Sequence, residues 1–327
     1  MADLNLTFAC PMYDRVVPLA TGEVKPEGIN LTIQTGESRQ IFDKMGGGLS
    51  FDLSEMSSSE YISRFSAGTC PFVALPVFPS RLFRHGFIAV NRKAGIRSPK
   101  DLEGKRVGVP LYTITAAVWI RGLLQHEYGV DLSKIHWVQG AMEKPGPHGR
   151  PGPLPPLLKA ISIEENKSGK GLSQRLYDGE IDATLGFALP KEIGRNPNIE
   201  RLFPNYREVE KDYYRRTGIF PIMHTLVIRR ALYEQHPFVA QSLYDAFRKA
   251  KEIALRRMMS PAAAGVLPYM QPWLMADAEE IDEVFGGDPW PYGIEPNRRT
   301  LEALVRYLVD QSLIPAPVKI EELFLLP

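Results

Sequence analysis

The most informative segment of the chain is Gly95-Ile96-Arg97-Ser98-Pro99-Lys100-Asp101-Leu102-Glu103-Gly104-Lys105-Arg106-Val107-Gly108-Val109-Pro110. It predicts a turn, then a short helix capped by Ser98 and stopped by Gly104, and then a buried strand. The next residues, Tyr112, Thr113 and Thr115 among them, are rich in hydroxyls and open a helix. Because the first N–H groups of a helix have no partner within it, a strand that leads into a helix forms a pocket for anions. The sequence therefore predicts a cleft that holds a small anion.

The bulk composition is that of an ordinary globular chain. Its 327 residues are enough for two lobes, and the net charge of +1 indicates neither a nucleic-acid partner nor a membrane-surface partner. The two cysteines, Cys10 and Cys70, have no metal-ligand spacing, so no metal is expected. No signal peptide is recognisable, and no window approaches the roughly 20 apolar residues of a membrane span. A cytoplasmic location is therefore expected.

Predicted strands and helices alternate along most of the chain, which is typical of open α/β sheets. Strands are expected at 4–9, 28–35, 51–53, 72–78, 87–90, 135–139, 181–186 and 223–228. Helices are expected at 38–45, with Gly46-Gly47-Gly48 as its stop, and at 114–128, 171–178, 237–258 and 297–312. The expected fold class is α/β with two lobes, each an open mixed sheet flanked by helices, and a cleft between them. Lobe 1 is assigned residues 1–92 and 220–327, and lobe 2 residues 93–219.

Polar side chains follow the expected strands at their carboxyl ends, where open α/β sheets bind ligands. Candidates from the first lobe are Arg15, Glu55, Ser57, Arg81 and His85, and the return crossing brings His224. An arginine guanidinium suits a carboxylate because it donates two parallel hydrogen bonds. These residue types favour a site that holds a carboxylate and moves a proton.

Each candidate also has a purely structural interpretation. Arg15 would pair with Asp14 at the surface, and Arg81 and Arg84 would cover an apolar strand with their stems. Glu55 and Ser57 would cap the helix that follows them, and His85 would be a core histidine. The sequence contains no H-E-x-x-H motif, no P-loop and no G-x-S-x-G motif. It therefore lacks the signatures of zinc proteases, of P-loop nucleotide-binding proteins and of α/β-hydrolases.

Several segments together carry a family resemblance. They are Tyr13-Asp14-Arg15, Phe51-Asp52-Leu53-Ser54-Glu55-Met56-Ser57, Pro79-Ser80-Arg81-Leu82-Phe83-Arg84-His85, Leu124-Gln125-His126-Glu127-Tyr128-Gly129-Val130, Thr217-Gly218-Ile219-Phe220-Pro221-Ile222-Met223-His224-Thr225 and Trp290-Pro291-Tyr292-Gly293-Ile294-Glu295-Pro296-Asn297-Arg298. With them, nearly the whole chain resembles the 4,5-dihydroxyphthalate decarboxylases. The resemblance implies a type II periplasmic-binding-protein fold and a cytoplasmic enzyme of phthalate breakdown. It also implies a carboxy-lyase that needs no cofactor. The proline- and glycine-rich loop at 143–156 is where we expect family members to differ.

The resemblance implies a role for each candidate in the conversion of 4,5-dihydroxyphthalate to protocatechuate and carbon dioxide. Arg15 and Arg81 clamp the retained carboxylate, and His85 or His224 donates a proton to the ring. Glu55 acts as the base on the phenol side of the substrate or as an orienting group there. Ser57, together with Tyr112, Thr113 and Thr115 from the second lobe, binds an anionic edge.

Other functions stay open at this point. The main alternative is a non-catalytic solute-binding protein for a small carboxylate, against which the missing export signal argues. Another cofactor-free lyase and a ligand-sensing module are further alternatives. The expected partner is a small aromatic acid, and the sequence is compatible with a homo-oligomer without requiring one.

Overall fold

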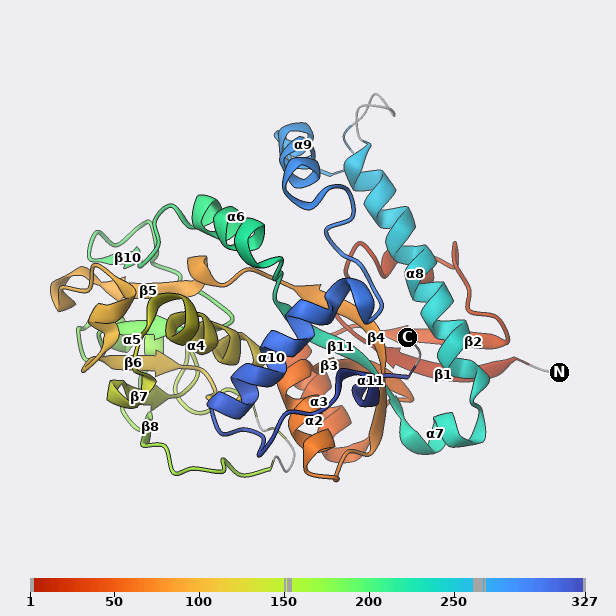
Figure 1. Cartoon of the computed structure of the whole chain (residues 1–327), viewed down its shortest axis with the longest axis horizontal. Coiled ribbons are helices and arrows are strands. Elements are labelled where there is room, and N and C mark those ends of the chain that lie inside the picture. The colour runs from red at the N-terminus through yellow and green to blue at the C-terminus, as the bar shows by residue number, and fades with distance from the viewer. Residues whose placement is uncertain (1–2, 150, 152–154, 261–266, 268, 326–327) are drawn as a thin grey trace.

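Two mixed β-sheets form the framework of the molecule (Figure 1). The structure is a computed structural model that describes residues 3–149, 151, 155–260, 267 and 269–325. The first sheet has the strand order β2 (Ile29–Gln34), β1 (Leu4–Ala9), β3 (Leu53–Ser57), β11 (Ile222–Arg229) and β4 (Phe72–Arg81). The second has the order β10 (Ile199–Arg201), β5 (Ile88–Asn91), β9 (Ala183–Leu185), β6 (Arg106–Val109), β7 (His136–Gln139) and β8 (Ile163–Glu165).

Each sheet combines a parallel part with a strand that runs the other way. In the first, β1 is parallel to β2 and β3, whereas β11 is antiparallel to β3 and β4. In the second, β6 is parallel to β7 and β9, whereas β5 is antiparallel to β9 and β10. The prediction of open mixed sheets is therefore confirmed.

The chain crosses between the sheets twice. It leaves the first sheet after β4 at Arg81 and enters the second at Ile88, the start of β5. It returns through α6 (Tyr206–Thr217) to β11. The sequence assigns residues up to 92 to the first lobe, but β5 pairs with β9 and β10 in the second sheet. Sheet membership thus changes at residues 82–87, because backbone pairing, and not the apolar character of β5, decides to which sheet it belongs.

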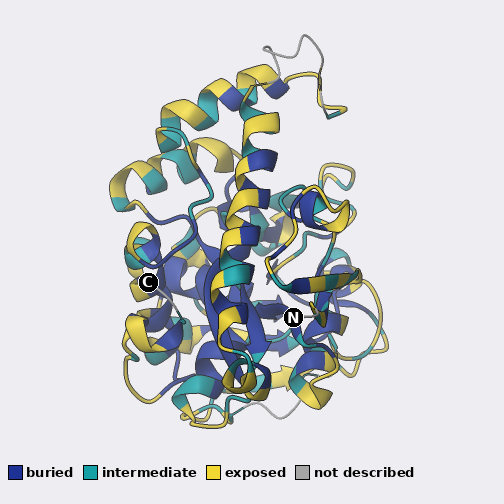
Figure 2. Cartoon of the chain, turned by 90° about the vertical axis from the view of Figure 1, so that its right-hand side faces the viewer, coloured by how far each residue is buried: buried dark blue, intermediate teal, exposed yellow. Residues whose placement is uncertain are grey.

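Helices cover the sheets, and buried residues concentrate on the strands and on the inner faces of the helices (Figure 2). The remaining α-helices are α1 (Val17–Ala20), α2 (Ser38–Gly48), α3 (Ser58–Ser66), α4 (Thr115–Tyr128), α5 (Leu172–Tyr177), α7 (Arg230–Gln235), α8 (Phe238–Met259), α9 (Leu274–Phe285), α10 (Arg298–Asp310) and α11 (Ile320–Leu323). Apolar residues at helical spacing form a buried stripe on α8, at Val239, Leu243 and Phe247, and another on α10, at Leu301, Leu304 and Leu308. No helix of the described residues has both the length and the apolar character needed to cross a membrane.

The last helices join the two halves of the molecule. Helix α10 contacts α4 beside the second sheet and α3 beside the first. Gly122 of α4 lies against Tyr307 of α10, and a Cβ atom at Gly122 would be 2.1 Å from the Tyr307 ring. Trp119 donates a 2.8 Å hydrogen bond to the carbonyl of Ile222 on β11. These contacts let one large hydrophobic core run through both sheets.

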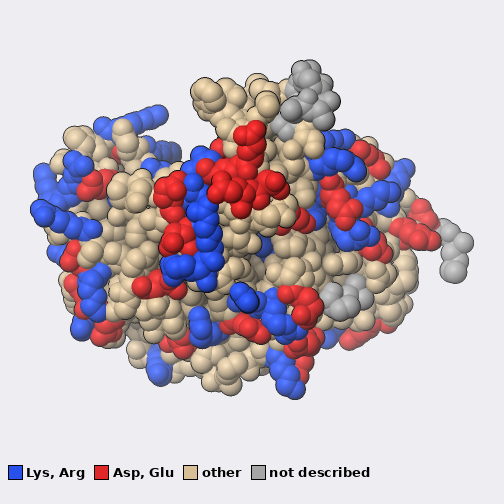
Figure 3. Space-filling model, turned by 45° about the horizontal axis from the view of Figure 1, so that its top comes forward, with Lys and Arg blue, Asp and Glu red and all other residues tan. Residues whose placement is uncertain are grey.

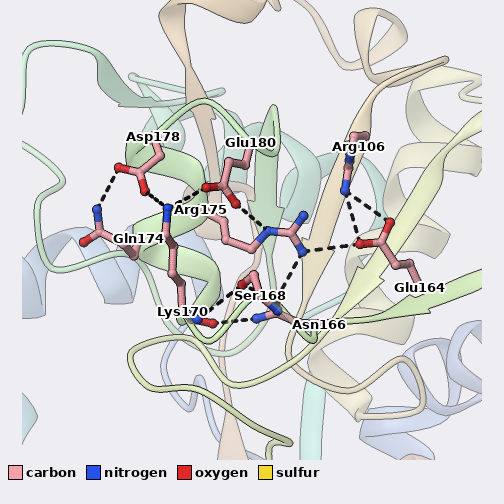
Figure 4. A network of polar contacts seen from close by, with 9 residues as sticks. All are labelled: Arg106, Glu164, Asn166, Ser168, Lys170, Gln174, Arg175, Asp178 and Glu180. Carbon is pink, nitrogen blue, oxygen red and sulfur yellow. Dashed lines mark hydrogen bonds and ion pairs between the residues drawn. The ribbon is translucent and has the colours of Figure 1, made fainter.

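Charged side chains lie in mixed pairs on the outside of this framework. Helix α6 is joined to α9 by ion pairs, including Arg207–Asp277 at 2.6 Å and Arg215–Glu283 at 2.8 Å. Figure 3 shows basic and acidic side chains next to one another on one face of the molecule. A second network, around Arg175, holds β8 and α5 at the edge of the second sheet (Figure 4).

Two elements differ from the sequence prediction in a way that matters for the site. Helix α2 continues through the three glycines and ends only at Leu49, which adopts a left-handed conformation with φ of 51°. Strand β3 begins at Leu53 and runs to Ser57, although the sequence predicts a strand at 51–53 followed by a helix. All residues of β3 are buried, but the polar ones among them hide the apolar pattern by which a buried strand is recognised in a sequence. As a result Glu55 lies in the middle of a sheet and not at a helix start.

Candidate active site

A cavity of about 740 Å³ lies where the strand ends of the two sheets meet. Its size is within the range of small-molecule sites. The first sheet and its loops contribute Pro11, Tyr13, Gly36, Glu37, Ser38, Arg39, Phe42, Ser57, Ser80, Leu82, Met223 and His224. The segments of the second half contribute Arg84, Ile114, Thr115, Ala116, His148 and Phe187. The predicted cleft between two sheets therefore exists, with polar groups on both walls.

The position of the His224 side chain is fixed by its strand, by a hydrogen bond and by ring packing. It lies on β11 opposite Ser57 of β3, and Leu226 lies opposite Glu55, so His224 and Glu55 are diagonal neighbours on one face. The Nδ1 atom of His224 is 2.5 Å from Oε1 of Glu55, and the ring packs edge-on against Phe42. Within the described residues Nε2 has no hydrogen-bond partner, which leaves it free to contact a molecule in the cavity.

Glu55 is fully buried behind His224. The hydroxyl of Tyr13 donates a 2.9 Å hydrogen bond to the same Oε1 atom. Burial and the adjacent Glu55 carboxylate raise the pKa of Tyr13 well above its usual value, so Tyr13 remains a neutral donor. A buried carboxylate needs such partners, and here they orient it toward the imidazole.

A hydroxyl cluster connects the two walls of the cavity. The Thr115 hydroxyl, at the start of α4, lies 2.9 Å from that of Ser57 and 3.1 Å from that of Ser59. It also accepts a 3.0 Å hydrogen bond from the Ser59 N–H. The first turn of α4 lines the cavity, and its unpaired N–H groups favour an anion there. The predicted role of this helix start is thus compatible with the geometry.

Two arginines line the cavity, and their surroundings differ. Arg39 binds the carboxylates of Glu60, at 2.5 Å, and Asp43, at 2.7 Å. Within the residues that the structure describes, the buried Arg84 donates to the Met223 sulfur at 3.2 Å and to the Gly186 carbonyl at 3.5 Å and to no carboxylate. Burial lowers the pKa of Arg84 to about 9.

His148 belongs to the proline- and glycine-rich loop and stacks on Phe187, with 4.6 Å between the ring centroids. Burial and the charge of Arg39 lower the pKa of His148 to about 4. The neutral ring and Phe187 therefore form an aromatic wall. Residues 150 and 152–154 of this loop lie outside the described residues.

The other predicted arginines lie outside the cavity. Arg15 donates to the Asp14 carboxylate and to the Pro79 carbonyl, and it lines a separate apolar pocket of about 300 Å³ beside Trp290. Arg81 is buried and donates to the side-chain oxygen of Asn297. Both guanidiniums are thus already held by protein oxygens. The predicted clamp does not form in the cavity.

His85, Tyr112 and Thr113 also point elsewhere. The His85 ring is buried among Phe203, Tyr213 and Tyr128 in the crossing between the sheets. Tyr112 packs edge-on against Trp137, and its ring faces the Arg121 guanidinium. Thr113 borders a small pocket apart from the main cavity. The structure therefore brings together Glu55, Ser57, Thr115 and His224 and separates the other five candidates from them.

Sequence reasoning missed several lining residues. Arg39, Phe42, His148 and Phe187 were not among the candidates, and Arg84 was weighed only as a stem that covers a strand. The unusual composition of the 143–156 loop was the one signal that pointed toward His148. No group of three or more His, Cys, Asp or Glu side chains suited to a metal ion occurs in the part of the chain that the structure describes.

Known proteins resemble this chain in sequence and in fold. A family model described as NMT1/THI5 like matches residues 82–145. A relative from Comamonas testosteroni, named 4,5-dihydroxyphthalate decarboxylase, is 36% identical over 326 residues, which cover 99% of this chain and 97% of the relative. The chain belongs to the 4,5-dihydroxyphthalate decarboxylase family. Another protein of that name, from Pseudomonas putida, is 37% identical over 217 residues, which cover 66% of this chain and 83% of that protein.

Solved structures show which fold this member of the 4,5-dihydroxyphthalate decarboxylase family has. The periplasmic aliphatic sulphonate binding protein SsuA from Escherichia coli matches with a TM-score of 0.52 and 14% identity, over 99% of this chain and 98% of SsuA. Protein AF1704 from Archaeoglobus fulgidus matches with a TM-score of 0.52 and 15% identity, over 95% of this chain and 98% of AF1704. The predicted periplasmic-binding-protein fold is confirmed.

Proposed function

We propose that this chain catalyses the non-oxidative decarboxylation of 4,5-dihydroxyphthalate to protocatechuate and carbon dioxide. Two relatives of that name support the reaction and the substrate. The observation that carries the chemistry is the imidazole of His224, which borders the cavity while Glu55 holds its other nitrogen. A cytoplasmic role in phthalate breakdown belongs to the same proposal and rests on the family resemblance.

The chemistry of the substrate sets what the site must supply. Direct loss of carbon dioxide would leave an aryl carbanion, which is very unfavourable. The easier route adds a proton to the ring carbon that carries the leaving carboxylate, and the phenol para to that carbon supplies the electron pair. The C–C bond to the carboxylate then breaks, its electrons return to the ring, and aromaticity is restored. The overall reaction consumes one proton, so the site needs a positioned proton donor.

His224 is the proposed donor. In its protonated form, Nε2–H gives the proton to the ring carbon, while Nδ1–H remains bonded to Glu55. The carboxylate stabilises the imidazolium and fixes the direction of the ring. Water replaces the proton after each turnover. The burial of Glu55 behind the histidine favours the orienting role over that of a base at the phenol.

The remaining walls provide binding. The first turn of α4, with Thr115 bonded to Ser57, offers N–H groups to an anionic edge of the substrate. Phe42 and the His148–Phe187 pair provide apolar surface for the aromatic ring. Movement of the two sheets toward each other would exclude water and strengthen these contacts.

The test is an assay of the purified protein with 4,5-dihydroxyphthalate, in which released carbon dioxide and protocatechuate are both quantified. His224→Gln should lower kcat by ~100-fold or more and leave KM nearly unchanged. His136→Gln, at an exposed histidine on β7, is the matched control and should behave as the unmodified protein. A non-catalytic binding protein would bind the substrate and release no carbon dioxide. Full activity of His224→Gln would contradict the assigned role.

A further inference from the structure

Arg84 is a buried cation without an anionic partner among the described residues. Only 6% of the residue is exposed, yet within the part of the chain that the structure describes its hydrogen bonds go to the Met223 thioether and to the Gly186 carbonyl. Among the described residues no ion pair or hydrogen bond joins Arg84 to Glu210, which acts on it through longer-range electrostatics and accepts a 3.1 Å hydrogen bond from the Gly86 N–H. The guanidinium also lies 4.9 Å from the centre of the Phe87 ring. None of these contacts replaces a carboxylate.

Arg39 also lines the cavity, but its guanidinium is surrounded differently from that of Arg84. Arg39 is neutralised by Glu60 and Asp43, so it has little to offer an anionic ligand. Burying an unpaired charge costs folding free energy, and buried charges in proteins are normally paired. An uncompensated guanidinium at the wall of a cavity is therefore well placed to receive its partner from the ligand.

We propose that Arg84 binds the carboxylate that the aromatic acid keeps throughout the reaction, and that Arg84 thereby selects acids with a carboxylate beside the reacting position. This assignment rests on the proposed decarboxylation. The planar guanidinium offers two parallel N–H donors, which match the two oxygens of a carboxylate.

The chemistry decides which of the two carboxylates is bound. The leaving carboxylate loses its charge as carbon dioxide forms. A strong ion pair to it would stabilise the substrate more than the transition state and would slow the reaction. The retained carboxylate keeps its charge from substrate to product. An ion pair there anchors the ring without opposing the chemical step.

The product makes this assignment testable, because protocatechuate has only the retained carboxylate. Arg84→Met should weaken the equilibrium binding of protocatechuate by at least ~10-fold, as expected for the loss of a charge-assisted hydrogen bond, and should raise KM for 4,5-dihydroxyphthalate by a similar factor. Arg84→Lys should give an intermediate affinity, since an ammonium keeps the charge and loses the two-pronged geometry. The melting temperature of Arg84→Met should not fall, because an unpaired buried charge is removed.

Arg201→Met is the matched control. Arg201 donates to the Gly86 carbonyl in the same region but does not line the cavity. The Arg201→Met variant should bind protocatechuate as the unmodified protein does.

Unchanged protocatechuate binding by Arg84→Met would overturn the assignment. A raised KM with unchanged product binding would also overturn it, because this result would place Arg84 on the leaving carboxylate. If Arg84→Met does not fold, an Arg84→Lys variant with full affinity contradicts the proposal. Weaker product binding in a protein that releases no carbon dioxide would support the Arg84 site and refute the decarboxylation.

Discussion

His224 and Glu55 form a hydrogen-bonded pair across two antiparallel strands, with 2.5 Å between Nδ1 and Oε1. The carboxylate is fully buried, and the imidazole reaches the cavity. This arrangement resembles a general acid held in place by an orienting group. The proposed proton transfer would depend on the two residues acting together, since neither position alone provides both direction and charge stabilisation.

The first prediction concerns this pair. Glu55→Gln keeps the size of the side chain and removes the charge that stabilises the imidazolium. We expect kcat to fall by ~100-fold or more while KM changes little. The double variant with His224→Gln should be no slower than His224→Gln alone, because Glu55 acts only through the histidine. Steady-state kinetics on the three variants measure this coupling. Additive losses would show that Glu55 has a separate role, such as that of a base at the phenol.

The second prediction concerns the hydroxyl cluster. Thr115→Val keeps the shape of the side chain and removes the hydroxyl shared with Ser57 and with the Ser59 N–H. We expect the free energy of unfolding to drop by about 1–3 kcal/mol, because buried polar groups lose their partner. KM should rise as the two walls lose their connection. Urea denaturation and steady-state kinetics give both values. Thr115→Ser retains the hydroxyl and should lie close to the unmodified protein.

The third prediction concerns His85 and pH. Burial lowers the pKa of His85 to about 4, from 6.5 in the unfolded chain. Between these pH values the unfolded chain binds the proton more tightly, so the free energy of unfolding falls as pH decreases from 6.5 to 4. The whole effect is about 3 kcal/mol. Glu210, whose pKa burial raises to about 7, acts in the opposite direction between pH 7 and 4.5.

His85→Phe isolates the histidine contribution. Denaturation curves at pH 7 and pH 5 should show a smaller loss of stability on acidification for His85→Phe than for the unmodified protein. Activity at neutral pH should stay near that of the unmodified protein, since His85 lies outside the cavity. Equal pH dependence in the two proteins would show that folding does not shift the pKa of His85.

The fourth prediction compares two glycines within helices. An alanine at Gly122 would place its Cβ 2.1 Å from the Tyr307 ring, so α4 and α10 would have to separate. We expect Gly122→Ala to destabilise the protein by about 3 kcal/mol or more, at the upper end for overpacking. Gly48 in α2 has room for a Cβ, with its nearest neighbour at 3.5 Å. Gly48 is the last residue of α2, so Gly48→Ala should stabilise the protein by about 0.5 kcal/mol, the lower end of the gain expected in the middle of a helix. Thermal unfolding of both variants shows whether the change in stability comes from the contact with Tyr307 or from the replacement of glycine by alanine as such.

Much of the fold follows from local patterns. The alternation of Leu4, Leu6 and Phe8 predicts β1, which runs from Leu4 to Ala9 as expected. The apolar stripe of α8 and the capped segment at 95–110 are equally local. Strand β3 was misplaced because Ser54, Glu55 and Ser57 are polar, and only their partners in neighbouring elements make their burial tolerable.

The site was harder to predict than the fold. The sequence placed Arg15 and Arg81 at strand ends, where a ligand clamp is expected. Their side chains turn to Asp14 and Asn297, and a guanidinium already bound to protein oxygens has little affinity left for a substrate. Arg84, which had a weaker claim from sequence, lines the cavity, and no carboxylate of the described residues forms an ion pair with it.

The α/β class, the helix that begins near Thr115 and the supply of histidine, glutamate and arginine side chains could be recognised from the sequence, because they depend on periodicity, on short-range capping and on composition. That β5 joins the second sheet, that Glu55 contacts His224, and that Arg84 lines the cavity while Arg15 and Arg81 do not, depends on contacts that form only in the folded chain. The physical reason is competition between partners. A charged side chain contacts the polar partner, or lines the cavity, that the fold brings close to it. The groups that compete for it come from residues far apart in the sequence.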